Sequence, residues 1–282
     1  NIDYEHLDYY RTYKNLENAF IRFINKTPPI GKSLVCSDNK NLNKILTKIK
    51  NKNILTYGFN KKADYRISNS RYNSDNSTFD LFYKDLNNKK KSIKNINIKL
   101  IGEHNILNAC AATAVCLNIG VKIEIIKKAL KNFSGVQRRM TKIFTKNKNE
   151  FFDDYAHHPT EIASILKGVK KSFKDRKVIS VFEPHRYSRV MLLKDAFSKA
   201  FAKSDLVLVC PLYAAGEKKN SKFDIYKFAE LISKNSKKQT VLVKSEIELA
   251  NFLKKNLITD EIIIGMGAGI ISKWIRNLQY NL

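Results

Sequence analysis

Residues 150–161 read Glu-Phe-Phe-Asp-Asp-Tyr-Ala-His-His-Pro-Thr-Glu, and residues 180–189 read Ser-Val-Phe-Glu-Pro-His-Arg-Tyr-Ser-Arg. Both stretches share one plan: an apolar run that predicts a buried strand, then a polar cluster, then a helical pattern. In an open α/β sheet, ligands bind at the carboxyl ends of the strands. The two stretches therefore predict an α/β domain whose binding site lies where these strands end.

The same alternation of strand and helix patterns runs from Met140 to the end of the chain. It predicts strands at 141–145, 151–154, 178–182, 206–210, 240–243 and 261–265, and helices near 160–173, 190–202, 224–234, 246–256 and 270–279. Such alternation is typical of a mostly parallel sheet that helices cover on both faces.

The N-terminal part of the chain has a different pattern. Alternating apolar residues from Asp64 to Leu100 predict an antiparallel meander, and small residues after Gly102 predict a helix that packs closely on its neighbours. We also predict helices over 13–25, 42–49, 109–117 and 123–133, and short strands over 33–36 and 54–57. The predicted domain boundary is Ser134-Gly-Val-Gln137.

Composition bounds the class of protein. A chain of 282 residues suits about two domains, and no apolar run approaches the roughly 20 residues that span a membrane. The net charge of +26 favours either a polyanionic partner or a compositional bias, because the lysines are spread along the whole length. The four cysteines form no Cys-x-x-Cys pair, which fits a reducing cytoplasm rather than a disulfide framework.

Two polar clusters follow the central predicted strands. Asp153, Asp154, Tyr155, His157 and His158 form the first cluster, which serves either as a turn with an Asp or Thr160 helix cap or as a functional site. We favour function, because two aspartates and two histidines exceed what a cap needs. Pro159 is expected in the first turn of the next helix.

The second cluster is basic. His185, Arg186 and Arg189 follow a strand and Pro184, and arginine binds carboxylate or phosphate through two parallel hydrogen bonds. The alternative is a solvated basic loop. We favour an anion site, because the cluster stands at a predicted strand end.

Four further features are weaker signals. Asn105 and Asn108 share a helix face and could pair with a purine edge, or they serve as a cap and in packing. His6 stands among carboxylates and could bind a divalent ion, although a surface histidine is the simpler interpretation. Tyr213-Ala-Ala-Gly-Glu217 follows another strand end, and Gly265-Met-Gly-Ala-Gly269 lacks the dinucleotide spacing and predicts close backbone packing.

Together these motifs resemble the Mur ligases, the ATP-dependent amide-forming enzymes of peptidoglycan synthesis. The motifs that carry the resemblance are Asn1-Ile-Asp-Tyr-Glu-His-Leu-Asp8, Gly102-Glu-His-Asn-Ile-Leu-Asn108, Gly135-Val-Gln-Arg-Arg139, Asp153-Asp-Tyr-Ala-His-His-Pro-Thr-Glu161, Pro184-His-Arg-Tyr-Ser-Arg189, Tyr213-Ala-Ala-Gly-Glu217 and Gly267-Ala-Gly269. The fourth and fifth motifs indicate the alanine-adding member. The murein peptide ligase of the same family shares the fourth motif, but its sequence is less similar to the fifth.

The resemblance implies a fold and a set of ligands. Residues 1–135 are expected to form the C-terminal part of a P-loop-type central ATPase domain, and residues 136–282 a Rossmann-like, mostly parallel C-terminal domain. The implied ligands are ATP, Mg²⁺, UDP-N-acetylmuramate and L-alanine, in the cytoplasm and without a nucleic-acid or membrane partner. The family's uridine-nucleotide domain and P-loop are expected upstream of residue 1, so the chain is expected to be a fragment that is inactive alone.

The resemblance also implies roles for single residues. His6 is expected to bind Mg²⁺, and Asn105, Asn108, Arg139 and Asp154 are expected to contact ATP. For the muramyl substrate and alanine, the implied site residues are Tyr155, His157, His185, Arg186, Arg189, Tyr213 and Glu217, with His157, His185, Arg186 and Arg189 in catalysis. A basic nucleic-acid-binding protein and an inactive gene product are the competing hypotheses.

Overall fold

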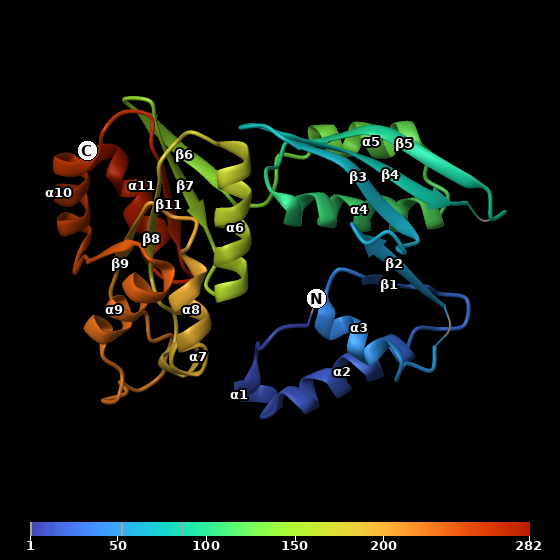
Figure 1. The fold of residues 1–282 in the computed structure, drawn as a ribbon, viewed down its shortest axis with the longest axis horizontal. Coiled ribbons are helices and arrows are strands. Elements are labelled where there is room, and N and C mark those ends of the chain that lie inside the picture. The colour runs from blue at the N-terminus through green and yellow to red at the C-terminus, as the bar shows by residue number, and fades with distance from the viewer. Residues whose placement is uncertain (1, 52, 86) are drawn as a thin grey trace. The chain divides into compact units, whose positions relative to one another are not determined.

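The computed structural model describes residues 2–51, 53–85 and 87–282, which form two compact units, Asn1–Phe133 and Ser134–Leu282. We refer to them as the N-terminal unit and the C-terminal unit. Figure 1 shows the elements of both along the chain. Residue 1, which opens the first motif, lies outside the described residues.

The N-terminal unit is built on one five-stranded sheet in the order β1-β2-β3-β4-β5. Its strands are β1 (Ser33–Cys36), β2 (Ile54–Gly58), β3 (Tyr65–Tyr72), β4 (Ser77–Lys84) and β5 (Lys90–Ile98), and its helices are α1 (Leu7–Tyr10), α2 (Tyr13–Asn25), α3 (Lys40–Leu46), α4 (Glu103–Asn118) and α5 (Ile123–Asn132). The predicted meander is confirmed, since β3, β4 and β5 pair antiparallel. The sequence did not predict that β3 also pairs parallel with β2, which joins both parts into one sheet.

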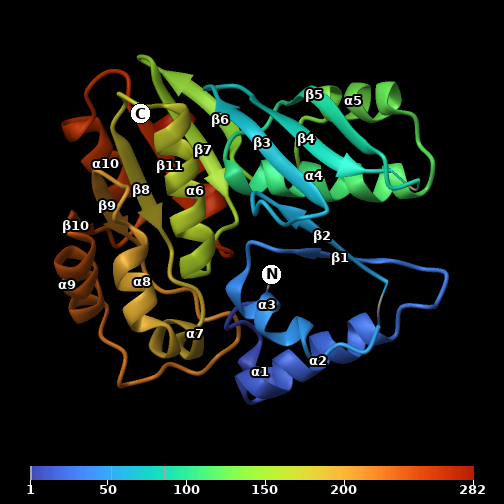
Figure 2. The same ribbon diagram turned by 45° about the vertical axis from the view of Figure 1, so that its right-hand side comes forward.

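Two helices of this unit follow from local sequence. α3 begins earlier than predicted because the Asn39 side chain accepts a hydrogen bond from the backbone N–H of Leu42 at 2.7 Å, as an N-cap does. In α4, the small buried residues Ala109, Cys110 and Ala114 let the helix pack directly on the sheet. The view in Figure 2 shows α4 running beside strands β2 to β4.

The C-terminal unit has a six-stranded sheet in the order β10-β9-β8-β11-β7-β6. Its strands are β6 (Thr141–Lys146), β7 (Asn149–Asp154), β8 (Val178–Phe182), β9 (Leu206–Val209), β10 (Gln239–Leu242) and β11 (Ile262–Met266), and its helices are α6 (Pro159–Ser172), α7 (Tyr187–Leu192), α8 (Lys194–Ala200), α9 (Ile225–Ser236), α10 (Glu246–Asn256) and α11 (Ile271–Asn281). All neighbouring strands are parallel except β6, which forms an antiparallel hairpin with β7. The predicted α/β fold is thus confirmed, although the helix predicted over 190–202 is two helices that meet at Leu193.

Helices cover both faces of this sheet, as the alternation predicts. Phe151, Val181 and Ile263 point to one face and pack with residues of α10 and α11. Phe152 and Phe182 point to the other face, where Phe182 contacts the aromatic rings of α8 and its C-terminal end. Strands that are apolar on both faces are what a covered parallel sheet requires.

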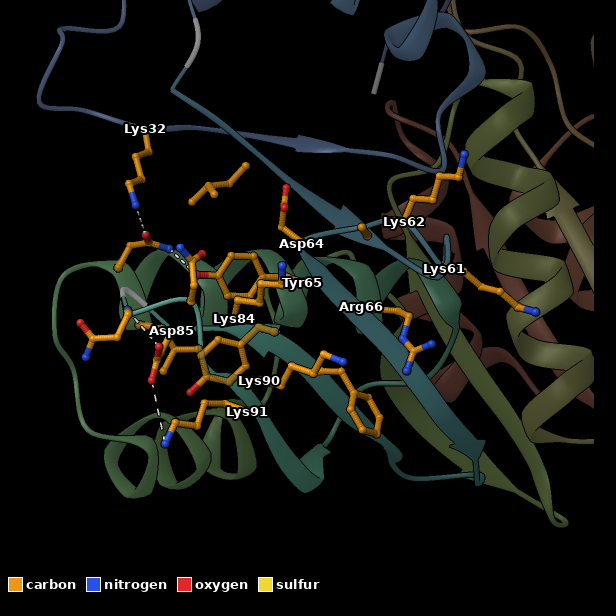
Figure 3. A pocket seen from close by; sticks show the side chains of 18 residues that line it. Lys32, Lys61, Lys62, Asp64, Tyr65, Arg66, Lys84, Asp85, Lys90 and Lys91 are labelled. Carbon is orange, nitrogen blue, oxygen red and sulfur yellow. Dashed lines mark hydrogen bonds and ion pairs between the residues drawn. The ribbon is translucent and has the colours of Figure 1, made fainter.

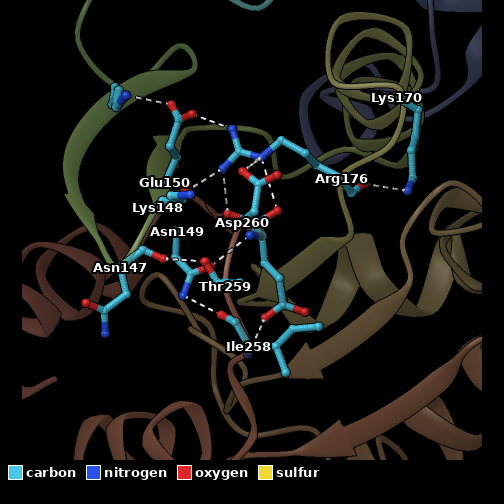
Figure 4. Close-up of polar contacts among 11 residues, drawn as sticks. Asn147, Lys148, Asn149, Glu150, Lys170, Arg176, Ile258, Thr259 and Asp260 are labelled. Carbon is cyan, nitrogen blue, oxygen red and sulfur yellow. Dashed lines mark hydrogen bonds and ion pairs between the residues drawn. The ribbon is translucent and has the colours of Figure 1, made fainter.

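A polar network closes the amino ends of β7 and β11, at the edge of the sheet away from the motifs (Figure 4). The Arg176 guanidinium pairs with the Glu150 carboxylate and donates to the carbonyl oxygens of Lys148 at 2.8 Å and Glu261 at 3.1 Å. Its Nε also lies 2.9 Å from Asp260 Oδ1. One side chain therefore joins the β6–β7 hairpin to the start of β11, which leaves the opposite edge for ligand chemistry.

The four cysteines are free thiols. Cys36, Cys110 and Cys210 are buried, while Cys116 on α4 is half-buried. Burial raises the pKa of Cys110 to about 12 and also raises that of Cys210. In the described part of the chain, no helix is long and apolar enough to cross a membrane.

Candidate functional site

Four loops of the C-terminal unit leave the sheet at the same level. Met266, the last residue of β11, pairs with Asp154 of β7 and with Phe182 of β8, and Phe182 pairs with Val209 of β9. The loops after β7, β8, β9 and β11 therefore start side by side. The parallel pairing of these strands is thus enough to bring together motifs that are far apart in the sequence.

A row of four rings connects three of these loops. Ring centroids are 5.1 Å apart for Tyr155 and His157, 5.6 Å for His157 and His185, and 5.6 Å for His185 and Tyr213. Tyr155 and Tyr213 at the two ends are 37% and 39% exposed, so solvent reaches both ends of the row. The structure thus assembles residues that the sequence predicts as parts of one site. We call Tyr155, His157, His185 and Tyr213 the ring row.

His185 is held as a neutral imidazole. Its Nδ1 lies 3.0 Å from Nη1 of Arg189, and since a guanidinium only donates hydrogen bonds, Nδ1 accepts and the ring proton is on Nε2. Burial, followed by the charges of Arg189, His157 and Arg186, lowers the pKa of His185 to about 4. The ring therefore offers a donor, Nε2–H, across the neutral pH range.

His157 has the opposite polarity. Its Nδ1 lies 2.8 Å from the carbonyl oxygen of Tyr155, which only accepts, so Nδ1 carries the proton. In the neutral ring, Nε2 then carries the lone pair and is the nitrogen that can take a proton. The two histidines of the ring row are therefore a donor and an acceptor.

The same loop also caps α6. The backbone N–H groups of His157 and His158 donate to Oε2 of Glu161 at 3.1 and 3.3 Å, and Thr160 N donates to Nδ1 of His158 at 3.3 Å. Pro159 begins the helix as predicted, but the N-cap is His158, whereas an aspartate or Thr160 was expected. The structural interpretation of this motif thus applies to His158, and a functional role for His157 stays a prediction.

The loops after β8 and β9 are bonded to each other. Arg186 N donates to the Tyr213 carbonyl at 2.9 Å, and Tyr213 N donates to the Pro184 carbonyl at 2.8 Å. Glu217 accepts from the backbone N–H of Ser188 at 3.1 Å and also from its hydroxyl, so it caps the first turn of α7. Glu217 therefore supports the start of α7, which has Arg186 at its N-cap position and Arg189 within it.

The two aspartates that end β7 hold neighbouring loops. Asp154 is 1% exposed, and its oxygens accept from Met140 N and Ala156 N, each at 2.7 Å. Burial outweighs these donors and raises the pKa of Asp154 to about 6. Asp153 accepts from the Ser272 hydroxyl at 2.5 Å and from Arg276 at 3.2 Å. Both carboxylates thus have structural partners, and the ribose contact of Asp154 stays a prediction.

Arg138 and Arg139 lie beside the Tyr155 end of the ring row. The Cζ atoms of Arg138 and Arg139 lie 4.7 and 6.0 Å from the Tyr155 ring centroid. Arg138 also donates to the Gly267 carbonyl at 2.7 Å, and exposed Arg139 pairs with Glu161 at 3.6 Å. Sequence analysis assigned a role to Arg139 only, although the adjacent arginine makes the closer contacts.

Gly265 near the end of β11 and Gly269 in the loop after it are closely packed, as predicted. A Cβ on Gly269 would lie 2.0 Å from Oε1 of Glu183 and 2.5 Å from Cγ of Tyr213, and a Cβ on Gly265 would lie 2.2 Å from Cγ1 of Ile275. At such distances a side chain at either position would force its neighbours to shift. Glu183 was missed in the sequence, where the only signal was a carboxylate at the end of an apolar strand.

The remaining predicted residues lie in the N-terminal unit. Half-buried Asn105 donates through its side chain to the Ile101 carbonyl at 2.8 Å, and Asn108 is exposed one turn further along α4. His6 is exposed just before α1. Within residues 2–51, 53–85 and 87–282, no group of three or more His, Cys, Asp or Glu residues could hold a metal ion. The binding of Mg²⁺ by His6 stays a prediction.

The N-terminal unit also contains an open basic hollow of about 1030 Å³ (Figure 3). Its charged lining consists of Lys32, Lys61, Lys62, Asp64, Arg66, Lys84, Asp85, Lys90 and Lys91. Asp64 accepts from Thr56, and Asp85 accepts from the backbone of its own turn. None of the predicted site residues lines this hollow, so it carries part of the basic composition without joining the candidate site.

Comparison with known families gives two matches. The Mur ligase middle domain matches residues 1–116, and the Mur ligase, glutamate ligase domain matches residues 138–269. The UDP-N-acetylmuramate–L-alanine ligase of Pelagibacter ubique is 47% identical over 278 residues, which are 99% of this chain and 60% of that protein. The chain spans less than two thirds of the length of the curated relatives that it matches.

Solved structures share the fold. The UDP-N-acetylmuramate-alanine ligase of Thermotoga maritima has a TM-score of 0.74 at 23% identity, covering 98% of this chain and 57% of that one. The MurF ligase of Thermotoga maritima in complex with ADP has a TM-score of 0.70 at 15% identity, covering 100% of this chain and 62% of that one. At these identities the likeness is evidence for the fold alone.

Proposed function

The chain belongs to the Mur ligase family, and on this premise we propose that the protein of which it forms part joins L-alanine to UDP-N-acetylmuramate with ATP. The observation that carries the proposal is the ring row with Arg186 and Arg189, assembled at the carboxyl edge of one sheet. We also propose that residues 1–135 belong to the central ATP-binding domain and residues 136–282 form the C-terminal domain.

The proposed reaction has two steps. A carboxylate oxygen of UDP-N-acetylmuramate attacks the γ-phosphorus of ATP, the bond to the β-phosphate oxygen breaks, and ADP leaves. The alanine nitrogen then attacks the acyl carbon of the resulting acyl phosphate and forms a C–N bond. The bond from this carbon to the phosphate oxygen breaks, and phosphate leaves with the electron pair. The amine must lose protons to attack and to complete the amide, so the site needs a proton acceptor.

The geometry of the C-terminal unit fits the second step. Arg186 is proposed to bind the alanine carboxylate through its planar fork, with Arg189 adding charge while it orients His185. His157 is proposed to take the amine proton at Nε2, because its Nδ1 is committed to the Tyr155 carbonyl. His185 is proposed to donate from Nε2–H to an oxygen of the acyl group. Tyr155, Tyr213 and Glu217 position these groups.

The nucleotide roles are proposed for four residues. Asn108 and Arg139 present exposed side chains that fit contacts to ATP, whereas the side chains of Asn105 and Asp154 are already bonded within the chain. When bound, Mg²⁺ neutralises phosphate charge in this class of reaction. His6 is proposed as one ligand of this ion.

The test uses the full-length protein with ATP, Mg²⁺ and UDP-N-acetylmuramate, and it follows ADP release with two amine acceptors. With L-alanine we expect ADP and a UDP-N-acetylmuramoyl-alanine product. Reaction with a murein peptide instead would assign the chain to a murein peptide ligase. Absence of ADP release with either acceptor would refute the proposal.

A further inference from the structure

Glu183 is a buried carboxylate beside the ring row that the proposed reaction does not use. It follows β8 directly, is 2% exposed, and its backbone N–H donates to the Met266 carbonyl at 2.9 Å, which extends the pairing of β8 with β11. Burial raises its pKa above the ordinary value. Burying a carboxylate costs free energy unless hydrogen-bond donors compensate for the lost water. The donors around Glu183 therefore indicate its structural role.

The partners of Glu183 are the backbone N–H groups that open α11. Oε2 accepts from Ile271 N at 2.7 Å, and the nearby N–H groups of Ile270 and Gly269 keep the pKa of the carboxyl from rising further, while buried Oε1 has no hydrogen-bond partner in the described part of the chain. The first N–H groups of a helix need acceptors, and Ile270 at the N-cap position supplies no side-chain bond. Glu183, which follows β8, thus caps α11, which follows β11.

The loop after β11 is held from both sides. Arg138 donates to the Gly267 carbonyl at 2.7 Å, while Glu183 accepts from the backbone that follows Gly269. A Cβ on Gly269 would collide with both Glu183 and Tyr213, so this loop touches the ring row directly. Tyr213 is in turn bonded to the loop of His185 by two backbone hydrogen bonds. The contacts of Glu183 therefore extend, through the loop after β11, to Tyr213 and from there to the loop of His185.

We propose that Glu183 is a positioning residue: it fixes the loop after β11 against Tyr213 and so sets where His185 and Arg186 meet the substrate. This proposal rests on the proposed function. The property that matters is an acceptor oxygen at this place. A neutral amide of the same shape keeps one such oxygen, whereas a thioether of similar length keeps none.

The test compares Glu183→Gln, Glu183→Met and Glu261→Met in the full-length protein. Glu261 is the matched control, because it is 5% exposed, lies at the opposite end of β11, and accepts from Ile258 N at 3.0 Å. We expect Glu183→Met to lower kcat/KM for L-alanine about tenfold or more, with KM for ATP changed by less than about threefold. Glu183→Gln should stay within about threefold of wild type.

Amide hydrogen exchange gives a readout that does not need activity. We expect faster exchange at residues 267–271 in Glu183→Met and wild-type exchange there in Glu183→Gln, while Glu261→Met lowers the unfolding midpoint and leaves KM for L-alanine unchanged. The proposal is overturned if Glu183→Gln is as damaging as Glu183→Met, or if Glu183→Met behaves like Glu261→Met. An inactive wild-type enzyme with normal exchange differences would reject only the proposed function.

Discussion

Arg189 Nη1 lies 3.0 Å from His185 Nδ1, so a side chain that only donates fixes the tautomer of an imidazole in the middle of the ring row. The same contact places a permanent positive charge beside a half-buried ring. Burial and this charge together lower the pKa of His185 to about 4. The relationship makes two predictions about protonation.

The first prediction concerns the titration of His185 by NMR in the full-length protein. We expect its midpoint near the value of about 4, well below the ordinary 6.5. Arg189→Met should raise the midpoint part of the way, because burial remains after the charge is removed. Arg139→Met is the control and should leave it unchanged, since Arg139 contacts Tyr155 and Glu161 instead. A wild-type midpoint near 6.5 would contradict the structure.

The second prediction concerns stability against pH. The folded pKa of His185 is lowered, so unfolding takes up a proton, and the stabilisation present above pH 6.5 is lost as the pH falls towards about 4. The folded pKa of Asp154 is raised, so its contribution is full below pH 3.8 and is lost as the pH rises through about 6. Denaturant titrations at several pH values give the free energy of unfolding as a function of pH. His185→Asn and Asp154→Asn should change the slope of this free energy against pH in opposite directions. If both variants changed this slope in the same direction, either the lowered pKa of His185 or the raised pKa of Asp154 would be wrong.

The third prediction is that Arg186→Ala in the intact enzyme lowers turnover at least tenfold, about 1.4 kcal/mol of transition-state stabilisation. A planar fork binds a carboxylate more specifically than an ammonium group does, so Arg186→Lys should recover only part of the loss. The measurement is the steady-state rate with L-alanine as the varied substrate. Unchanged kinetics in Arg186→Ala would count against the proposed alanine site.

The fourth prediction separates the proton acceptor from the packing of the ring row. His157→Phe keeps a ring between Tyr155 and His185 but has no Nε2, so kcat should fall about a hundredfold or more. The unfolding midpoint should change little, because the caps of α6 are His158 and Glu161. In a profile of kcat against pH, the variant should also lose the rise in rate that accompanies deprotonation of the proton acceptor. Full activity of His157→Phe would exclude His157 as the base.

The fifth prediction concerns the network at the amino edge of the sheet. Arg176→Lys keeps the charge but loses most donors to Glu150, Lys148 and Glu261, so unfolding should cost about 2 kcal/mol less. Chemical denaturation measures this difference. Because the network is far along the strands from the ring row, KM for L-alanine should not change. A raised KM would mean that the two edges of the sheet are coupled.

The sequence was most informative where local chemistry decides structure. Apolar runs ending in Asp154 and Phe182 predicted strands, and Pro159 predicted the start of α6, because burial and proline geometry act within a few residues. Spacing could not show that β11 inserts between β7 and β8. That order depends on long-range packing, and it is what brings Gly269 against Glu183 and Tyr213.

For the candidate site, the sequence predicted which side chains lie together in the C-terminal unit, while their roles stay predictions. Tyr155, His157, His185 and Tyr213 are neighbours as expected from strand ends. The sequence did not reveal that Glu217 caps α7, because this bond depends on the fold of two loops. Roles for Asn105, Asn108 and His6 stay predictions.

Unequal burial of the cysteines has a practical consequence for labelling. A cysteine reacts with a maleimide as the thiolate, which is the nucleophile, and burial keeps Cys110 and Cys210 protonated while it also shields Cys36. Among the described residues, Cys116 is the one cysteine with a half-exposed side chain. A maleimide fluorophore should therefore attach to α4 at a single position of this chain without any engineered cysteine. In this chain, a label at Cys116 would report on the N-terminal unit by fluorescence.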